Sequence, residues 1–151
     1  MNIGGKITMD KWDTRFLELA KHVAQWSKDP STKCGAVIVR SDKTIASMGY
    51  NGFPRGIEDS TDLLSNREEK YKRVIHAEMN AILTAREPLL DYTLYTWPFM
   101  TCERCAVHVI QAGIKRVVSL VPTGEQSERW GESFHTAQRL YDEAGIWWEL
   151  L

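Results

Sequence analysis

Residues 93–121, TLYTWPFMTCERCAVHVIQAGIKRVVSLV, decide the fold. Thr93–Trp97 and Arg116–Val121 are short runs rich in apolar, aromatic and β-branched side chains, which is typical of strands. Cys102–Ala112 lies between them, has the length and pattern of a helix, and is followed by Gly113 as a stop. A helix between two such strands favours a right-handed parallel crossover. The stretch therefore predicts a strand–helix–strand unit of one sheet.

The chain before this unit supplies a helix and a hairpin. Residues 9–27 are predicted to be helical because apolar side chains recur on one face. That face carries Trp12, Phe16, Ala20, Val23 and Trp26. Cys34–Arg40 and Thr44–Tyr50 are β-rich and flank a polar turn, which predicts an antiparallel hairpin. The polar and charged residues 57–74 are predicted to cover the surface.

Further elements complete the order α-β-β-α-β-α-β-α-β. His76–Arg86 is predicted to be a helix, Thr123–Glu132 a polar loop, Ser133–Ala144 a helix, and Ile146–Leu151 a final strand. We expect the α/β class: a three-layer α/β/α sandwich with a mixed five-stranded sheet and helices on both faces. A length of 151 residues fits a single domain over 1–151, with residues 1–7 as a flexible lead.

The charge balance favours a small-molecule substrate over a polynucleotide. Nineteen basic and 20 acidic residues give a formal net charge of −1, and no long basic run is present. Proteins that hold polynucleotides usually carry a basic excess or stripe. The sequence has no apolar run long enough for a membrane span, and its first thirty residues lack a signal-peptide pattern. We therefore expect a cytoplasmic protein without a membrane partner.

Two short motifs carry the candidate chemistry: His76-Ala77-Glu78 and Cys102-Glu103-Arg104-Cys105. Two cysteines three residues apart share one helix face, and a helix N-terminus favours their thiolate form. Two thiolates and one imidazole match a catalytic zinc site with an open fourth position. Glu78 would lie beside the metal without binding it, where it could take a proton from water and deliver it to the substrate. This combination is the motif of zinc deaminases.

Two other interpretations of the cysteines stay open from the residues alone. Cys102 and Cys105 could form half of a structural zinc site, with Cys34 or His108 as the fourth ligand. They could also form a redox-active pair, in which case the His-x-Glu motif would be coincidental. The simplest interpretation of Cys34 is a small buried residue at the start of a strand.

Four blocks in the same order resemble the deoxycytidylate deaminases of the cytidine and deoxycytidylate deaminase family. They are SKDPS (27–31), GYNGFPRG (49–56), HAEMNAIL (76–83) and IQAGI (110–114), and the resemblance covers residues 10–145. It implies a cytidine deaminase-like fold, zinc bound by His76, Cys102 and Cys105, and Glu78 as proton shuttle. It also implies hydrolysis of deoxycytidylate (dCMP) to dUMP and ammonia in pyrimidine deoxynucleotide metabolism, by attack of zinc-activated water on C4.

The resemblance extends to binding residues. It implies that Asn51 contacts the sugar, that the backbone around Ala77 reads the base edge, and that Gly52, Phe53, Pro54 and Arg55 form part of an effector site. The implied effectors are dCTP and dTTP, with Mg²⁺ on their phosphates, and the implied assembly is a homo-oligomer, namely a hexamer. From residue type alone, Lys28 and Arg55 are phosphate candidates, and Arg129 with Trp130 could cover the nucleotide.

One departure from the family pattern leaves the exact substrate open. Thr101 stands where the family has proline, Pro98 lies four residues before Cys102, and the connection over 96–101 is one residue longer. Thr101 is predicted to cap the helix that follows. Alternative substrates are dCTP, a 5-modified dCMP or a free nucleoside. Polynucleotide editing, as in tRNA adenosine deaminases, is disfavoured by the charge, and a non-enzymatic binding module is disfavoured by the presence of all four key residues.

Overall fold

A computed structural model describes residues 10–151 and shows one five-stranded sheet in the order β2-β1-β3-β4-β5. The strands are β1 (Gly35–Val39), β2 (Ile45–Tyr50), β3 (Thr93–Trp97), β4 (Arg116–Ser119) and β5 (Trp147–Leu150). β1 pairs antiparallel with both β2 and β3, whereas β3, β4 and β5 run parallel. The predicted hairpin, parallel unit and mixed sheet are confirmed. The predicted flexible lead at 1–7 lies outside the described residues.

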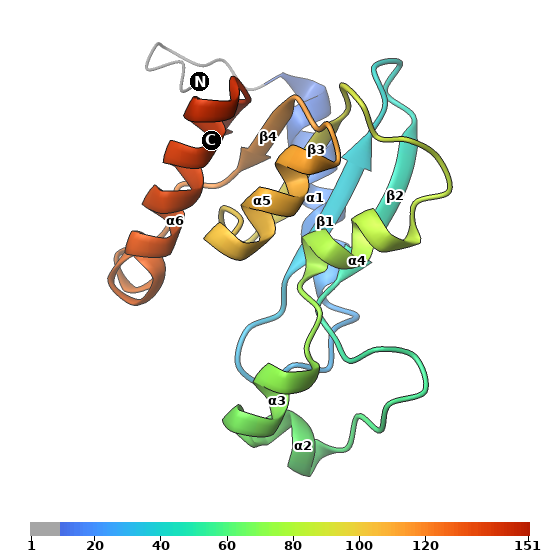
Figure 1. Cartoon of the computed structure of the whole chain (residues 1–151), viewed down its shortest axis with the longest axis vertical. Helices are drawn as coiled ribbons and strands as arrows, with labels where there is room; N and C mark the ends of the chain where they lie inside the picture. Colours follow the sequence, from blue (N-terminus) through green and yellow to red (C-terminus); the bar gives the residue numbers. More distant parts are fainter. Residues whose placement is uncertain (1–9) are drawn as a thin grey trace.

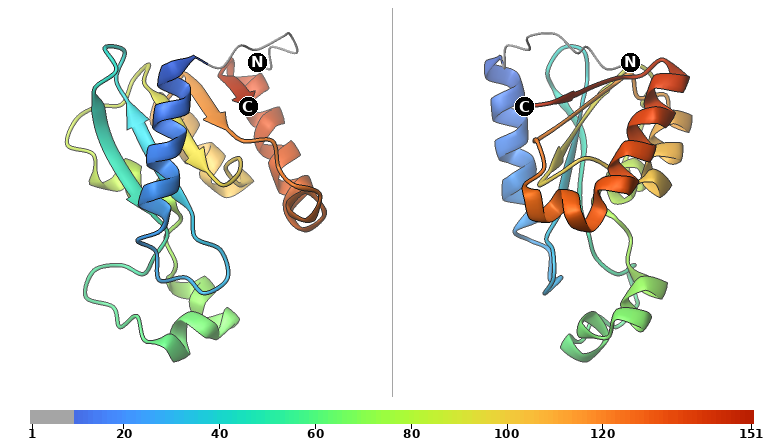
Figure 2. Two further views of the ribbon diagram at one scale, coloured as in Figure 1. Left: turned by 180° about the vertical axis from the view of Figure 1, so that it is seen from behind. Right: turned by 90° about the vertical axis from the view of Figure 1, so that its left-hand side faces the viewer.

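Helices cover both faces of the sheet, which gives the predicted three layers (Figures 1 and 2). One face is covered by α1 (Lys11–Ala24), and the other by α4 (Ala77–Thr84), α5 (Glu103–Gln111) and α6 (Gly124–Ala144). Alternate residues of β1 face opposite ways. Val37 and Val39 join the apolar cluster under α1, whereas Ala36 and Ile38 join the larger cluster under the other three helices. The sheet therefore has two apolar cores.

Two short helices lie beyond the end of the sheet (Figure 1). They are α2 (Thr61–Ser65) and α3 (Arg67–Arg73), and they come from the segment predicted to cover the surface. The side chains of Ser60 and Asn66 cap them. Only Leu64 is buried in α2, and no residue of α3 is, so the surface location is as predicted. No helix within residues 10–151 has the length and apolar character needed to cross a membrane.

Two expectations about helix boundaries were wrong. The region predicted as a polar loop, Thr123–Glu132, is mostly the first half of α6. Thr123 and Gln126 form a capping box, which satisfies backbone N–H groups at the start of this helix and lets it begin nine residues early. Trp26 was predicted on the core face, but α1 ends at Ala24, and Trp26 is 52% exposed beside Tyr50. Trp148 is buried and Trp147 exposed, as their alternation predicts.

Helix α4 packs against β2 so closely that only glycine fits between them. A Cβ atom at Gly49 would lie 2.5 Å from the carbonyl oxygen of Ala77 and 2.5 Å from the backbone nitrogen of Ala81. Backbone atoms of a helix cannot give way as a flexible side chain can. The position of the first turn of α4 therefore depends on Gly49.

We predict that Gly49→Ala lowers the free energy of unfolding by about 1–3 kcal/mol, because α4 must move away from the sheet. Gly131→Ala, in α6, is the matched control, since its added Cβ would meet nothing closer than 3.9 Å. That control should raise stability slightly, by up to about 1 kcal/mol, through its better helix propensity. Guanidinium unfolding measures both. Equal effects of the two substitutions would contradict the proposed close packing.

Candidate active site

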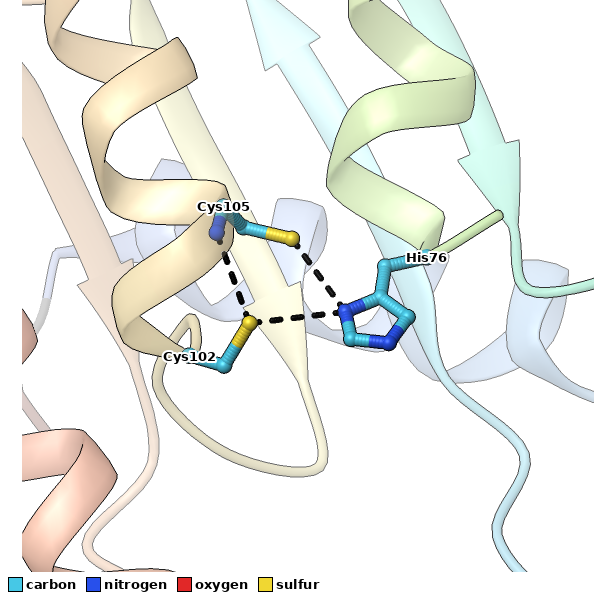
Figure 3. A group of neighbouring side chains, drawn as sticks. All are labelled: His76, Cys102 and Cys105. Carbon is cyan, nitrogen blue, oxygen red and sulfur yellow. Dashed lines mark hydrogen bonds between the residues drawn. The ribbon is translucent and has the colours of Figure 1, made fainter. Parts of the chain in front are cut away.

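Three metal-ligand side chains meet where the N-termini of α4 and α5 lie side by side (Figure 3). His76 is the N-cap residue of α4, Cys102 is the N-cap residue of α5, and Cys105 lies in the first turn of α5. His76 Nδ1 lies 3.2 Å from Cys105 Sγ and 3.4 Å from Cys102 Sγ. All three ligand atoms lie within 4.8 Å of one another. The structure therefore brings together the three residues that the sequence predicts as ligands.

The donor set fits zinc with one position left for a small molecule. Two cysteine sulfurs and one imidazole nitrogen are donors that zinc prefers, and three protein ligands are typical of catalytic sites. Within residues 10–151, no fourth histidine, cysteine, aspartate or glutamate belongs to this group. His108 is exposed, and its Nδ1 lies 2.8 Å from the carbonyl oxygen of Arg104. The geometry thus favours the catalytic arrangement over the structural one.

The two thiols differ in their acidity. The Cys105 thiol hydrogen-bonds to Cys102, and this bond lowers the pKa of Cys102 to about 4. The same bond raises the pKa of Cys105. The backbone N–H of Cys105 also donates to the Cys102 sulfur, at 3.4 Å. These hydrogen bonds favour the thiolate form of Cys102, and a divalent cation bound by both sulfurs would also displace the proton of Cys105.

Glu78 lies in the first turn of α4 and is only 7% exposed. It lines the same pocket as His76 and Cys102 but does not belong to the ligand group. Burial raises the pKa of its carboxyl group. A carboxyl group with a raised pKa holds a proton more readily than an exposed one does, which suits general acid–base chemistry.

The site opens into a pocket with a volume of about 170 Å³. Besides His76, Cys102 and Glu78, four residues that the sequence analysis predicts to bind the nucleotide line it: Asn51, Ala77, Arg129 and Trp130. Lys28 and residues 52–55 are not among its lining residues. The Lys28 ammonium instead lies 2.8 Å from Asp59 in an exposed ion pair. The structure therefore brings together most, but not all, of the predicted binding residues.

Asn51 is buried, and hydrogen bonds fix its orientation. Its side-chain nitrogen donates to the carbonyl oxygen of Thr32 at 2.9 Å and to Asp29 Oδ2 at 3.3 Å. Its side-chain oxygen accepts from the backbone N–H of Cys34 at 2.8 Å. Because both N–H bonds have partners, the amide presents a fixed oxygen, with one further lone pair, to a ligand.

An aromatic wall, which we define as Phe99, Trp130 and Phe134, forms one side of the pocket. The ring centroids of Phe99 and Trp130 are 4.9 Å apart, and those of Phe99 and Phe134 are 5.2 Å apart. The Arg129 guanidinium lies 4.4 Å from the Trp130 ring centroid, within range of a cation–π contact. This wall can pack against a planar ligand.

Sequence reasoning missed the residues that α3 and its flanks contribute. Lys70, Tyr71 and Val74 line the pocket, although they belong to a segment predicted only to cover the surface. A pair of backbone hydrogen bonds between Gly52 and Ile75 brings this segment back to the site, at 2.8 and 3.1 Å. The side-chain pattern of residues 57–74 does not predict the pairing of Gly52 with Ile75. That pairing uses backbone groups only, and its two residues are 23 positions apart in the sequence.

Thr101 does not cap α5 as predicted. The Cys102 side chain takes that role, and Thr101 is buried. The Thr101 hydroxyl lies 2.6 Å from the hydroxyl of Tyr141, a fully buried residue of α6. This hydrogen bond fixes the residue next to the first cysteine to the underlying helix.

Comparisons with known proteins agree with the geometry. Residues 10–121 match the family model described as the cytidine and deoxycytidylate deaminase zinc-binding region. The chain is 41% identical to an uncharacterized deaminase from the luxG 3′ region of Aliivibrio fischeri, over 91% of this chain and 92% of that protein. It is 36% identical to deoxycytidylate deaminase of Mus musculus, over 90% and 77%. Its fold is similar to that of dCMP deaminase from cyanophage S-TIM5 in complex with dCMP and dUMP, with a TM-score of 0.74, 23% identity, and coverage of 96% and 100%.

We predict that Thr101→Val and Tyr141→Phe each cost about 1–3 kcal/mol of unfolding free energy, because each leaves one buried hydroxyl without its partner. The double variant should cost less than the sum of the two, since it removes both polar groups together. Guanidinium unfolding of the zinc-loaded protein measures the coupling. Strictly additive costs would show that the two hydroxyls do not depend on each other.

Proposed function

Because this chain belongs to the cytidine and deoxycytidylate deaminase family, we propose that it hydrolyses dCMP to dUMP and ammonia, as a step of pyrimidine deoxynucleotide metabolism. The observation that carries this proposal is an unligated, buried carboxyl group, Glu78, in the same pocket as a three-ligand metal group. Hydrolytic deamination needs both, since water must be activated and protons must reach the leaving amine.

His76 would bind zinc through Nδ1, and Cys102 and Cys105 would bind it through their sulfurs. The support for this is that these three atoms face one another in the structure. Bound zinc supplies a Lewis acid that makes water nucleophilic at neutral pH.

Glu78 moves the protons in the proposed reaction. Its carboxylate accepts a proton from the attacking water and delivers it to N3 of the base, as the new C4–O bond forms. It then transfers the second water proton to the amino group, so that the C4–N bond breaks and ammonia leaves. Because Glu78 is buried, bulk water does not compete for these protons.

Three sets of residues would orient the nucleotide. The Asn51 oxygen, which hydrogen bonds hold in a fixed orientation, would accept a hydrogen bond from a sugar hydroxyl. The small side chain of Ala77, fully buried at the start of α4, would leave room for the base to approach the ligand group with its edge on the backbone. Arg129 and Trp130 would cover the nucleotide from α6.

Regulation and assembly remain proposals from the family resemblance. We propose that residues 52–55 take part in binding dCTP or dTTP with Mg²⁺, and that the chain forms a homo-oligomer, a hexamer by that resemblance. The hydrogen bonds between Gly52 and Ile75 support the first, because they connect this loop to the segment that leads into His76. The exposed Trp147 on edge strand β5 supports the second.

We predict that Glu78→Gln lowers kcat for dCMP by about 10²- to 10⁴-fold, because the amide cannot carry the proton. The variant should still bind one zinc ion per chain, since Glu78 is not a ligand. Glu103→Gln is the matched control, because Glu103 occupies the first turn of the neighbouring α5 and is exposed. Steady-state kinetics and metal analysis give the two readouts. Turnover by Glu78→Gln near that of the unsubstituted chain would refute the proposed proton route.

We predict that dCMP gives the highest kcat/KM in a panel of cytosine compounds. The panel contains dCMP, CMP, dCTP, 5-methyl-dCMP, deoxycytidine, a tRNA and a single-stranded DNA oligonucleotide, each assayed for ammonia release with zinc-loaded protein. A second series includes dCTP or dTTP with Mg²⁺ as effectors of dCMP turnover. A higher kcat/KM for any other compound would replace dCMP as the substrate while leaving the reaction class intact.

A further inference from the structure

We propose that the 5′-phosphate of the nucleotide binds where two cavities join, against Lys70 and Ser31, with Arg67 adding positive charge. This inference rests on the proposed function, because it takes the ligand to be a nucleoside monophosphate. It assigns the phosphate contact to the α2–α3 segment.

The first observation is the second cavity. It has a volume of about 210 Å³ and lies beside the pocket that holds the ligand group. It is lined by Pro30, Ser31, Leu64, Ser65, Arg67 and Lys70. Ser31 and Lys70 also line the first pocket, so the two cavities join at these residues. The lining combines two cations and two hydroxyl groups, which is the chemistry that binds a phosphate.

The second observation is the exposure of the two cations, Lys70 and Arg67, and their ion pairing. The Lys70 side chain is only 14% exposed, and its ammonium lies 3.1 Å from Asp29 Oδ1. Three N–H donors on one ammonium leave two for a further acceptor. Arg67 is exposed, and it has no ion pair within the described residues 10–151. Two cations against one carboxylate leave net positive charge at the junction.

The third observation is that Asp29 connects the proposed sugar contact to the proposed phosphate contact. Its Oδ1 accepts from Lys70 and from the backbone N–H groups of Ser31 and Thr32. Its Oδ2 accepts from Asn51. A chain of contacts thus runs from Asn51, through Asp29, to Lys70. Starting from the ligand group, this order matches base, sugar and phosphate along one nucleotide.

Other cations near the site fit the role less well. Lys28 is exposed, pairs with Asp59, and lines neither cavity. Arg129 lines the first pocket only, and its guanidinium lies over Trp130. Lys70 is the lysine that lines both cavities.

The test compares a substrate that carries the phosphate with one that lacks it. Zinc-loaded chains with Lys70→Met, Lys70→Arg and Arg67→Met are assayed for kcat/KM on dCMP and on deoxycytidine. Lys72→Met is the matched control, because Lys72 lies on the same helix, is exposed, and pairs with Glu68 and Glu69. Calorimetry with dUMP and deoxyuridine measures binding of the same two classes without turnover. Thermal unfolding shows whether each variant is folded.

We expect Lys70→Met to lower the ratio of kcat/KM for dCMP to that for deoxycytidine by about 10- to 100-fold, the range for losing a hydrogen bond to a charged group. Arg67→Met, an exposed charge, should lower it by about two- to fivefold. Lys70→Arg should restore part of the loss, and Lys72→Met should leave the ratio unchanged.

Equal losses on both substrates in Lys70→Met would overturn the inference, because Lys70 would then act only through the fold. An unchanged ratio would overturn it as well. Should Lys70→Met fail to fold, Arg67→Met decides, since it keeps the Lys70–Asp29 pair. If the unsubstituted chain deaminates neither compound, the proposed function fails, and the preference for dUMP over deoxyuridine in calorimetry still judges the phosphate contact separately.

Discussion

The contact between α4 and β2 at Gly49 is the constraint on which the active site depends. Because no side chain separates the helix from the strand, the N-terminus of α4 has one position relative to the sheet. The parallel crossover through α5 places a second helix start beside it. His76 and Cys102 are both N-cap residues, so their side chains leave the backbone before either helix begins. The side chains of His76 and Cys102 can therefore point toward each other. Side chains on the flanks of two neighbouring helices would do so less readily.

The proposed function gives the site a reactive end and a recognition end, and both contain buried polar groups. At the reactive end, Glu78 is buried, and this burial raises the pKa of its carboxyl group. At the recognition end, the Asp29 carboxylate accepts four hydrogen bonds, and these offset the free-energy cost of burying its charge. Asn51 lies between the two ends and has no freedom to rotate. The protein therefore offers a ligand a rigid set of contacts, which limits the entropy lost on binding.

Much of this arrangement could be predicted from local sequence. The metal ligands follow from residue types and spacing at two predicted helix starts, and the sheet follows from the alternation of strands and helices. The errors have physical causes. The polar run predicted as a loop, Thr123–Glu132, is mostly helical because the capping box of Thr123 and Gln126 starts α6 there. The Cys102 sulfur displaced Thr101 as cap, since Thr101 found a buried partner in Tyr141. Lys70 could not be placed, because only the tertiary pairing of Gly52 with Ile75 returns its segment to the site.

The α2–α3 segment lies outside the two cores, and none of the α3 residues is buried. Substitutions at its exposed positions would therefore leave the two packed cores largely unchanged. If Lys70 binds the phosphate as proposed, substitutions in this peripheral segment would change recognition of the nucleotide while the chemistry stays the same. Substrate range and catalytic machinery then become separately evolvable traits of one fold.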